Sequence, residues 1–138
     1  MYSTMAKISN KKLQEETLVQ IHKRLVKTLK KAGTSGNMGD VLDDLLTETE
    51  EIMIAKRLSI IFLLNEGMSM YAIHKHLGVS KNTVSYMKER FLQDGYDSLV
   101  TLFKKKKERE EMWSYLEIII RGGMPERGKN RWKALDRK

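Results

Sequence analysis

Apolar residues recur at helical spacing along almost the whole chain, and no segment alternates in the way that is typical of a strand. The first stretch runs from about residue 10 to Lys31 or Ala32 and has one apolar stripe, with lysines on its other faces. The stripe consists of Leu13, Leu18, Ile21, Leu25 and Leu29. We expect this helix to end at Gly33, and a short second helix to begin at the cap residue Asp40.

A third helix is predicted from Thr47 to Glu66, with Gly67 as its stop. Thr47 and Glu50 have the spacing of a capping box. In this motif the threonine side chain accepts from the backbone amide three residues ahead, and the glutamate side chain accepts from the backbone amide of the threonine. The apolar residues of this helix cover nearly its whole circumference, and they are Ile52, Met53, Ile54, Ala55, Leu58, Ile60, Ile61, Phe62, Leu63 and Leu64. Such a helix must be buried on every side. A chain of this length has little mass to surround it, so we expect a second copy of the chain to cover it in a homodimer.

Residues 69–94 follow the pattern of a helix-turn-helix, two short helices joined by a tight turn. Ser69 and Ser80 each stand directly before a helical segment, and Gly78 permits the turn between the segments. The first segment ends at Leu77 and the second runs from Lys81 to about Gln93. The positions expected to face inward are apolar, and they are Ile73, Leu77, Val79, Val84, Met87 and Phe91.

A last helix is predicted from about Ser98 to Arg121, which makes the fold all-α with about six helices. We expect residues 1–121 to form a single domain and residues 122–138 to form a basic, flexible C-terminal tail. Within the last helix, the run from Lys104 to Lys107 has two interpretations. It is a solvated face with i,i+4 charge pairs, or a set of contacts to phosphates.

The composition bears on the class of partner. The 138 residues include 26 Lys and Arg against 18 Asp and Glu, and the net charge is +8. A chain this basic is expected to bind a polyanion, foremost nucleic acid. The absence of cysteine excludes disulfides, thiol catalysis and cysteine-based zinc sites, and it suits a cytosolic protein.

Other chemistries lack the residues that they need. His74 and His76 are two positions apart on a predicted helix and point to different sides, so they cannot chelate one metal ion. The sequence has neither a recognisable catalytic triad nor a glycine-rich phosphate loop. The most apolar stretch, Ile52 to Leu64, is interrupted by Lys56 and Arg57 and is too short to cross a bilayer. We therefore expect a cytoplasmic protein that is not an enzyme and binds neither a metal nor a membrane.

The second helix of the helix-turn-helix presents side chains that suit DNA. Because Val84 and Met87 face inward, the helical period turns its polar residues outward. Among these, an asparagine amide can pair with adenine, and a lysine can bind guanine or a phosphate. The free backbone amides at the helix start add a further phosphate site. The predicted DNA-binding residues are Ser80, Lys81, Asn82, Thr83, Ser85, Tyr86 and Lys88. The alternative is that they form only the solvated face of a surface helix.

A set of motifs from Asp44 to Tyr96 identifies a resemblance. The motifs are Leu45-Leu46-Thr47 with Glu50, Ala55-Lys56-Arg57-Leu58, Leu63-Leu64, Glu66-Gly67-Met68-Ser69, Leu77-Gly78, Ser80, Thr83-Val84-Ser85 and Asp94-Gly95-Tyr96. In their order and spacing they resemble the Trp repressor family. The resemblance implies an intertwined homodimer that holds two recognition helices about 34 Å apart, facing a nearly palindromic DNA site.

The same resemblance raises the question of an effector. In the family, tryptophan lies between the long core helix and the recognition helix, and Thr47, Arg57 and Thr83 match three of the positions that hold it. The resemblance therefore makes these three residues the candidates for an effector pocket, while Thr47 is also explained as a helix cap and Arg57 as the partner of an acid across the dimer. Tyr86 stands in place of an arginine and offers no positive charge, and Met87 replaces a glycine and would fill the slot. We therefore expect no cofactor, and tryptophan is not the expected corepressor.

These observations predict a homodimeric, sequence-specific DNA-binding transcriptional regulator of Trp-repressor type. Its partners are double-stranded DNA and a second copy of itself. One alternative is a DNA-binding subunit of a transposition system, because the segment from Arg90 to Leu99 resembles the reading heads of transposases. Another alternative is a module that binds RNA or protein with the same pair of helices.

Overall fold

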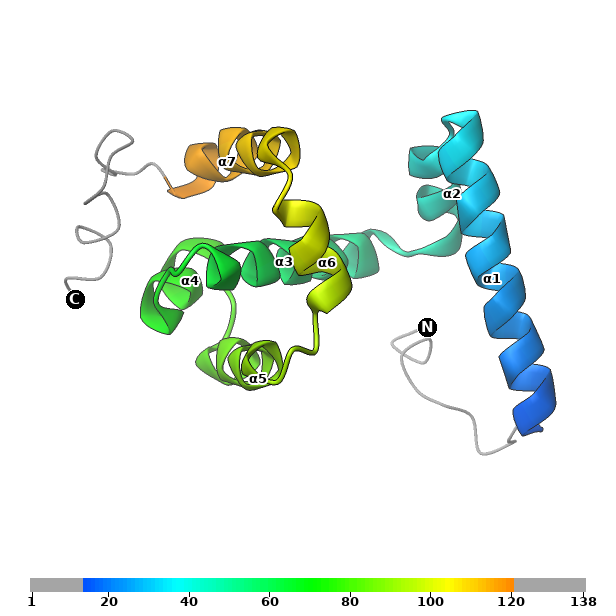
Figure 1. Ribbon diagram of the computed structural model, residues 1–138, viewed down its shortest axis with the longest axis horizontal. Helices are drawn as coiled ribbons and strands as arrows, with labels where there is room; N and C mark the ends of the chain where they lie inside the picture. Colours follow the sequence, from blue (N-terminus) through cyan, green and yellow to red (C-terminus); the bar gives the residue numbers. More distant parts are fainter. Residues whose placement is uncertain (1–13, 121–138) are drawn as a thin grey trace. The chain divides into compact units, whose positions relative to one another are not determined.

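The computed structural model describes residues 14–120 of the chain, and this part contains seven helices and no strand. The helices are α1 (Glu15–Ser35), α2 (Met38–Leu45), α3 (Glu48–Asn65), α4 (Met70–Leu77), α5 (Lys81–Leu92), α6 (Asp97–Phe103) and α7 (Lys106–Ile120) (Figure 1). The predicted all-α class is confirmed. The predicted tail at 122–138 and the helix start near residue 10 lie outside the described residues. Between residues 14 and 120, no helix is both long and apolar enough to cross a membrane.

The chain divides into two compact units, Met1–Glu48 and Thr49–Lys138. In the first unit, α1 packs against α2. Two predicted boundaries here are wrong. Gly33 lies inside α1, and Gly36 ends the helix in the left-handed conformation with φ at 80°. Asp40 lies in the first turn of α2, where its charge favours the positive helix end, while Asn37 is the cap residue.

The long helix α3 begins at Glu48, directly after Thr47 as predicted, while the reciprocal bonds of the capping box stay a prediction. Its end has the Schellman geometry. Gly67 adopts φ of 88°, and the amide of Met68 donates to the carbonyl of Leu63 at 3.0 Å. The second half of α3 is the centre of the core of the second unit, and its five consecutive buried residues are Ile60, Ile61, Phe62, Leu63 and Leu64.

The prediction of one last helix from Ser98 to Arg121 is wrong, because α6 and α7 are separate helices. The rings of Phe103 and Trp113 both contact Phe62 edge-on, with centroid distances of 5.1 Å and 5.2 Å. In one straight helix, two residues ten positions apart are separated by about 15 Å along the axis. Both rings could not then reach the same phenyl ring. The break between Phe103 and Lys106 brings them together on α3.

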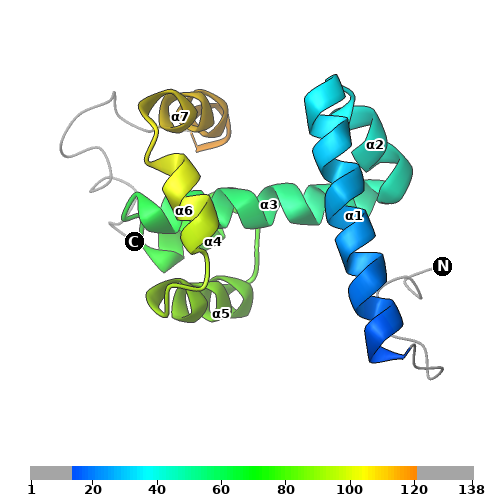
Figure 2. The same cartoon turned by 45° about the vertical axis from the view of Figure 1, so that its right-hand side comes forward.

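The lysine run Lys104–Lys107 lies where α6 joins α7 and is exposed. Lys106 and Glu110 form an i,i+4 ion pair at 3.9 Å, which agrees with the interpretation of this run as a solvated helix face. Figures 1 and 2 both show α7 and α5 on opposite sides of α3. The lysine run joins α6 to the start of α7 and lies outside the helix-turn-helix.

A buried carboxylate attaches α7 to the end of α3. The side chain of Glu66 is 6% exposed and accepts hydrogen bonds from Arg109 Nε at 2.9 Å and from the Trp113 indole N–H at 2.8 Å. Arg109 also forms an ion pair with the same carboxylate at 2.9 Å. Because hydrogen bonds to an ionised acceptor are stronger than neutral ones, this cluster fixes the position of α7.

We expect Glu66→Ala to lower the free energy of unfolding by about 2–3 kcal/mol, because two donors lose a shared, charged acceptor in a largely buried place. Urea denaturation followed by circular dichroism measures the change. Glu66→Gln keeps an acceptor oxygen for the indole and should lose about half as much. Equal stabilities for Glu66→Ala and the parent chain would show that the cluster does not hold α7.

Candidate nucleic-acid interface

The helix-turn-helix is set by local caps at both helix starts. Ser69 Oγ accepts from the amide of Ala72 at 3.1 Å, and Ser80 Oγ accepts from the amide of Thr83 at 3.1 Å. Between the helices, Gly78 adopts φ of 64° and ψ of 39°, the left-handed conformation that a glycine reaches without strain. The predicted bounds of both helices are confirmed to within one residue. The predicted inward residues of α4 and α5 are buried or half-buried, and they are Ile73, Leu77, Val79, Val84, Met87 and Phe91.

A histidine braces the turn. His74 Nδ1 donates to the carbonyl oxygen of Val79 at 2.5 Å, across the turn from α4. This bond satisfies a carbonyl that has no partner within either helix. Burial, together with the charge of Lys75, lowers the pKa of His76 below its ordinary value of 6.5, so this second histidine adds little positive charge at neutral pH.

Three of the predicted DNA-binding residues meet in one place. Lys81, Asn82 and Ser85 are exposed on the first two turns of α5 and line the same shallow hollow of about 410 Å³. Its other wall is formed by Met70 and Tyr71 from the start of α4. The helical period predicted the α5 residues of this hollow. No local pattern in the sequence marks the α4 residues, because their place beside α5 depends on the angle between the two helices.

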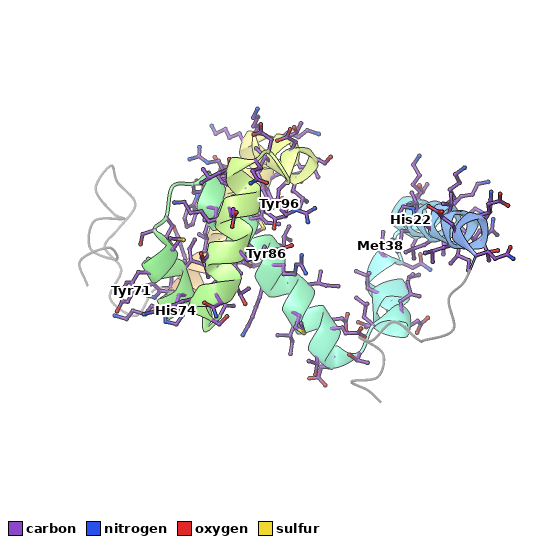
Figure 3. All side chains as sticks on the ribbon, turned by 90° about the horizontal axis from the view of Figure 1, so that it is seen from below. His22, Met38, Tyr71, His74, Tyr86 and Tyr96 are labelled. Atoms are coloured by element: carbon purple, nitrogen blue, oxygen red, sulfur yellow. The ribbon has the colours of Figure 1, made fainter. Side chains whose placement is uncertain are left out.

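The remaining predicted residues lie around this hollow. The hydroxyls of Ser80 and Thr83 are 2.8 Å apart and bond to each other at the start of α5. Lys88 is half-buried two turns further along the helix. Tyr86 is 62% exposed and lies on the side of α5 that faces α3, away from Tyr71 and His74 (Figure 3). The seven predicted residues therefore fall into three groups. Lys81, Asn82 and Ser85 line the hollow, Ser80 and Thr83 bond to each other at the start of α5, and Tyr86 and Lys88 lie further along the helix.

The predicted effector residues are brought together only in part. Arg57 and Thr83 line a hollow of about 360 Å³ between α3 and α5, together with Tyr86 and Met87. Met87 lines this hollow and is 2% exposed, and the expectation that its side chain takes the place of a tryptophan stays a prediction. Thr47 belongs to the other compact unit.

Two capped helices, a left-handed glycine between them and an exposed polar face on the second helix define a helix-turn-helix protein. A family model described as "Trp repressor protein" matches residues 20–107, which include α2 to α6 and most of α1. The chain belongs to the Trp repressor family, a family of helix-turn-helix DNA-binding regulators rather than enzymes. Among curated proteins and among solved structures, no match to the chain was found.

Proposed function

We propose that this protein is a cytoplasmic, homodimeric transcriptional regulator that recognises a specific sequence of duplex DNA with α5. The observation that carries the proposal is the exposed group Lys81, Asn82 and Ser85 at the start of a helix whose opposite side is buried through Val84 and Met87. A helix held in this way can enter the major groove with its N-terminal residues against the base edges.

The charge of the chain supports capture of a polyanion before the sequence is recognised. Lys81 and Lys88 lie on α5 itself, and the chain as a whole carries a net charge of +8. Contacts of lysine with phosphates release counterions and give affinity without sequence preference. In our proposal Lys88 supplies such a contact, while Asn82 and Ser85 distinguish the bases.

The homodimer is supported by apolar side chains that are exposed in the part of the chain that the structure describes. On α3, the residues Ile52, Met53 and Ile54 are each at least half exposed. On α1 and α2, the exposed apolar residues are Leu18, Val19, Ile21, Leu25, Val26 and Leu45. A surface of this kind is covered in a stable protein, and two copies of an interlocking chain would cover it mutually.

The proposed regulator does not require tryptophan. The hollow between α3 and α5 has room for a small molecule, and Arg57 and Thr83 are available to hold one. Tyr86 and Met87 occupy the positions of the arginine and the glycine that the family uses for tryptophan. An effector, where one exists, is therefore expected to differ from tryptophan.

We expect Asn82→Ala to weaken binding to the preferred DNA site by about 1–3 kcal/mol and to relax the preference at one base position. The cause is the loss of an amide that can pair with a base edge. We expect Lys88→Gln to weaken all duplexes alike and to reduce the salt slope by about one. Fluorescence anisotropy with the preferred and a scrambled duplex, over a series of salt concentrations, measures both effects.

A matched control is Lys105→Gln, which removes the same charge from an exposed lysine between α6 and α7, outside the helix-turn-helix. It should change the affinity less than Lys88→Gln does. If Asn82→Ala leaves both the affinity and the base preference unchanged, α5 is not the recognition helix. Equal affinity of the parent protein for duplex RNA and for every duplex DNA would favour an RNA-binding module instead.

A further inference from the structure

The hollow between the first turns of α4 and α5 has two chemically different walls. Lys81, Asn82 and Ser85 make the wall on α5, with donors and acceptors of hydrogen bonds. Met70 and Tyr71 make the wall on α4, and they are 42% and 38% exposed. An apolar surface therefore stands beside the proposed base-reading groups.

Among residues 14–120, the core does not include this apolar wall. The next two residues of α4, Ala72 and Ile73, are fully buried and attach the helix to the core. Tyr71 instead lies beside His74, with ring centroids 6.3 Å apart and the planes tilted by 59° (Figure 3). Because His74 is bonded to the carbonyl of Val79, the tyrosine ring rests against a group that the turn holds in place.

The two walls correspond to the two parts of an A·T pair in the major groove. Adenine presents N7 and N6, which an asparagine amide can bind together, while thymine presents O4 and a 5-methyl group. Both sets lie on the same edge of the base pair. A helix that offers its amide to the adenine therefore needs an apolar surface next to it for the methyl group.

We propose that Met70 and Tyr71 form a receptor for a thymine 5-methyl group, at or next to the adenine that Asn82 recognises. The inference rests on the proposed function, since it assumes that α5 lies in the major groove. It adds the base that is recognised and assigns a specificity-determining role to two residues of α4. Burying one methyl group corresponds to about a fourfold change in affinity.

The test compares thymine with deoxyuridine, which lacks only the methyl group and keeps the same hydrogen bonds. Starting from the duplex that the full-length protein selects from a random pool, each thymine is replaced in turn, and the affinity is measured at constant salt. One position in each half-site should lose about fourfold on replacement. With Tyr71→Ala, thymine and deoxyuridine at that position should bind alike.

Two variants keep the comparison specific. Tyr71→Phe retains the ring and should retain the preference for thymine. Tyr115→Ala removes an exposed tyrosine from α7, outside the helix-turn-helix, and should keep the same ratio of the two affinities. Melting curves by circular dichroism confirm that each variant is folded.

The outcomes separate this inference from the proposed function. A selected site that is insensitive to deoxyuridine at every position, or a preference that survives in Tyr71→Ala, would overturn the methyl receptor while leaving sequence-specific binding intact. A random pool that yields no preferred duplex at all would overturn the proposed function and the receptor together.

Discussion

Ile54→Asp is expected to convert the protein from a dimer to a monomer and to weaken its binding to DNA by about a hundredfold or more. In the proposed dimer, Ile54 would be covered by the partner, and an aspartate there would be a buried charge without a counter-charge. A buried charge of this kind costs about 3–5 kcal/mol. The affinity for DNA falls as well, because a monomer has one recognition helix and the dimer has two.

The substitution is chosen because the single chain does not depend on Ile54. Its side chain is 51% exposed and lies outside the buried core cluster of the second unit. Sedimentation velocity gives the oligomeric state, and circular dichroism gives the helix content. The matched control is Thr49→Asp, which adds the same charge at an exposed polar position near the start of α3 and should leave the dimer intact. A monomeric Ile54→Asp that binds DNA as tightly as the parent protein would contradict the proposal.

Phe62→Ala is expected to lower the free energy of unfolding by about 3–5 kcal/mol. Phe62 is fully buried on α3, and the rings of Phe103 and Trp113 both rest against it. Its removal would leave a cavity at the point where α6 and α7 join the core. Because the stability of a whole domain is about 5–15 kcal/mol, the variant should lose a large part of its stability.

Urea denaturation followed by tryptophan fluorescence measures this effect, since Trp113 is in direct contact with the substituted ring. Phe62→Leu fills most of the cavity and should lose less than half as much. A loss below about 1 kcal/mol for Phe62→Ala would mean that α6 and α7 are not packed on α3 as described.

The parts of the fold that the sequence predicts well are those that depend on neighbours along the chain. Ser69 and Ser80 cap the two helices of the helix-turn-helix through bonds to residues three positions ahead. Gly67 and Gly78 take the left-handed conformations that end α3 and α4. The break between α6 and α7 is different, since it follows from the position of a ring on α3 that lies more than forty residues earlier in the chain.

The candidate site also contains residues that the local sequence predicts and residues that it does not. The 3.6-residue period places Lys81, Asn82 and Ser85 on one face of α5, and this much follows from the sequence. The apolar wall from α4 requires the angle between the helices, which the sequence does not contain. The contact of Glu66 with Trp113 joins residues 47 positions apart, and no local pattern marks it.

Selection of duplexes from a random pool by the 138-residue chain tests directly whether two copies of α5 recognise DNA together. We predict that the enriched sequences form an inverted repeat, with half-sites separated by about one turn of the double helix, or about 34 Å. That spacing would reflect two copies of α5 held by one dimer. Enrichment of a single unrepeated half-site, or of no sequence at all, would contradict a dimer that recognises DNA with two copies of α5.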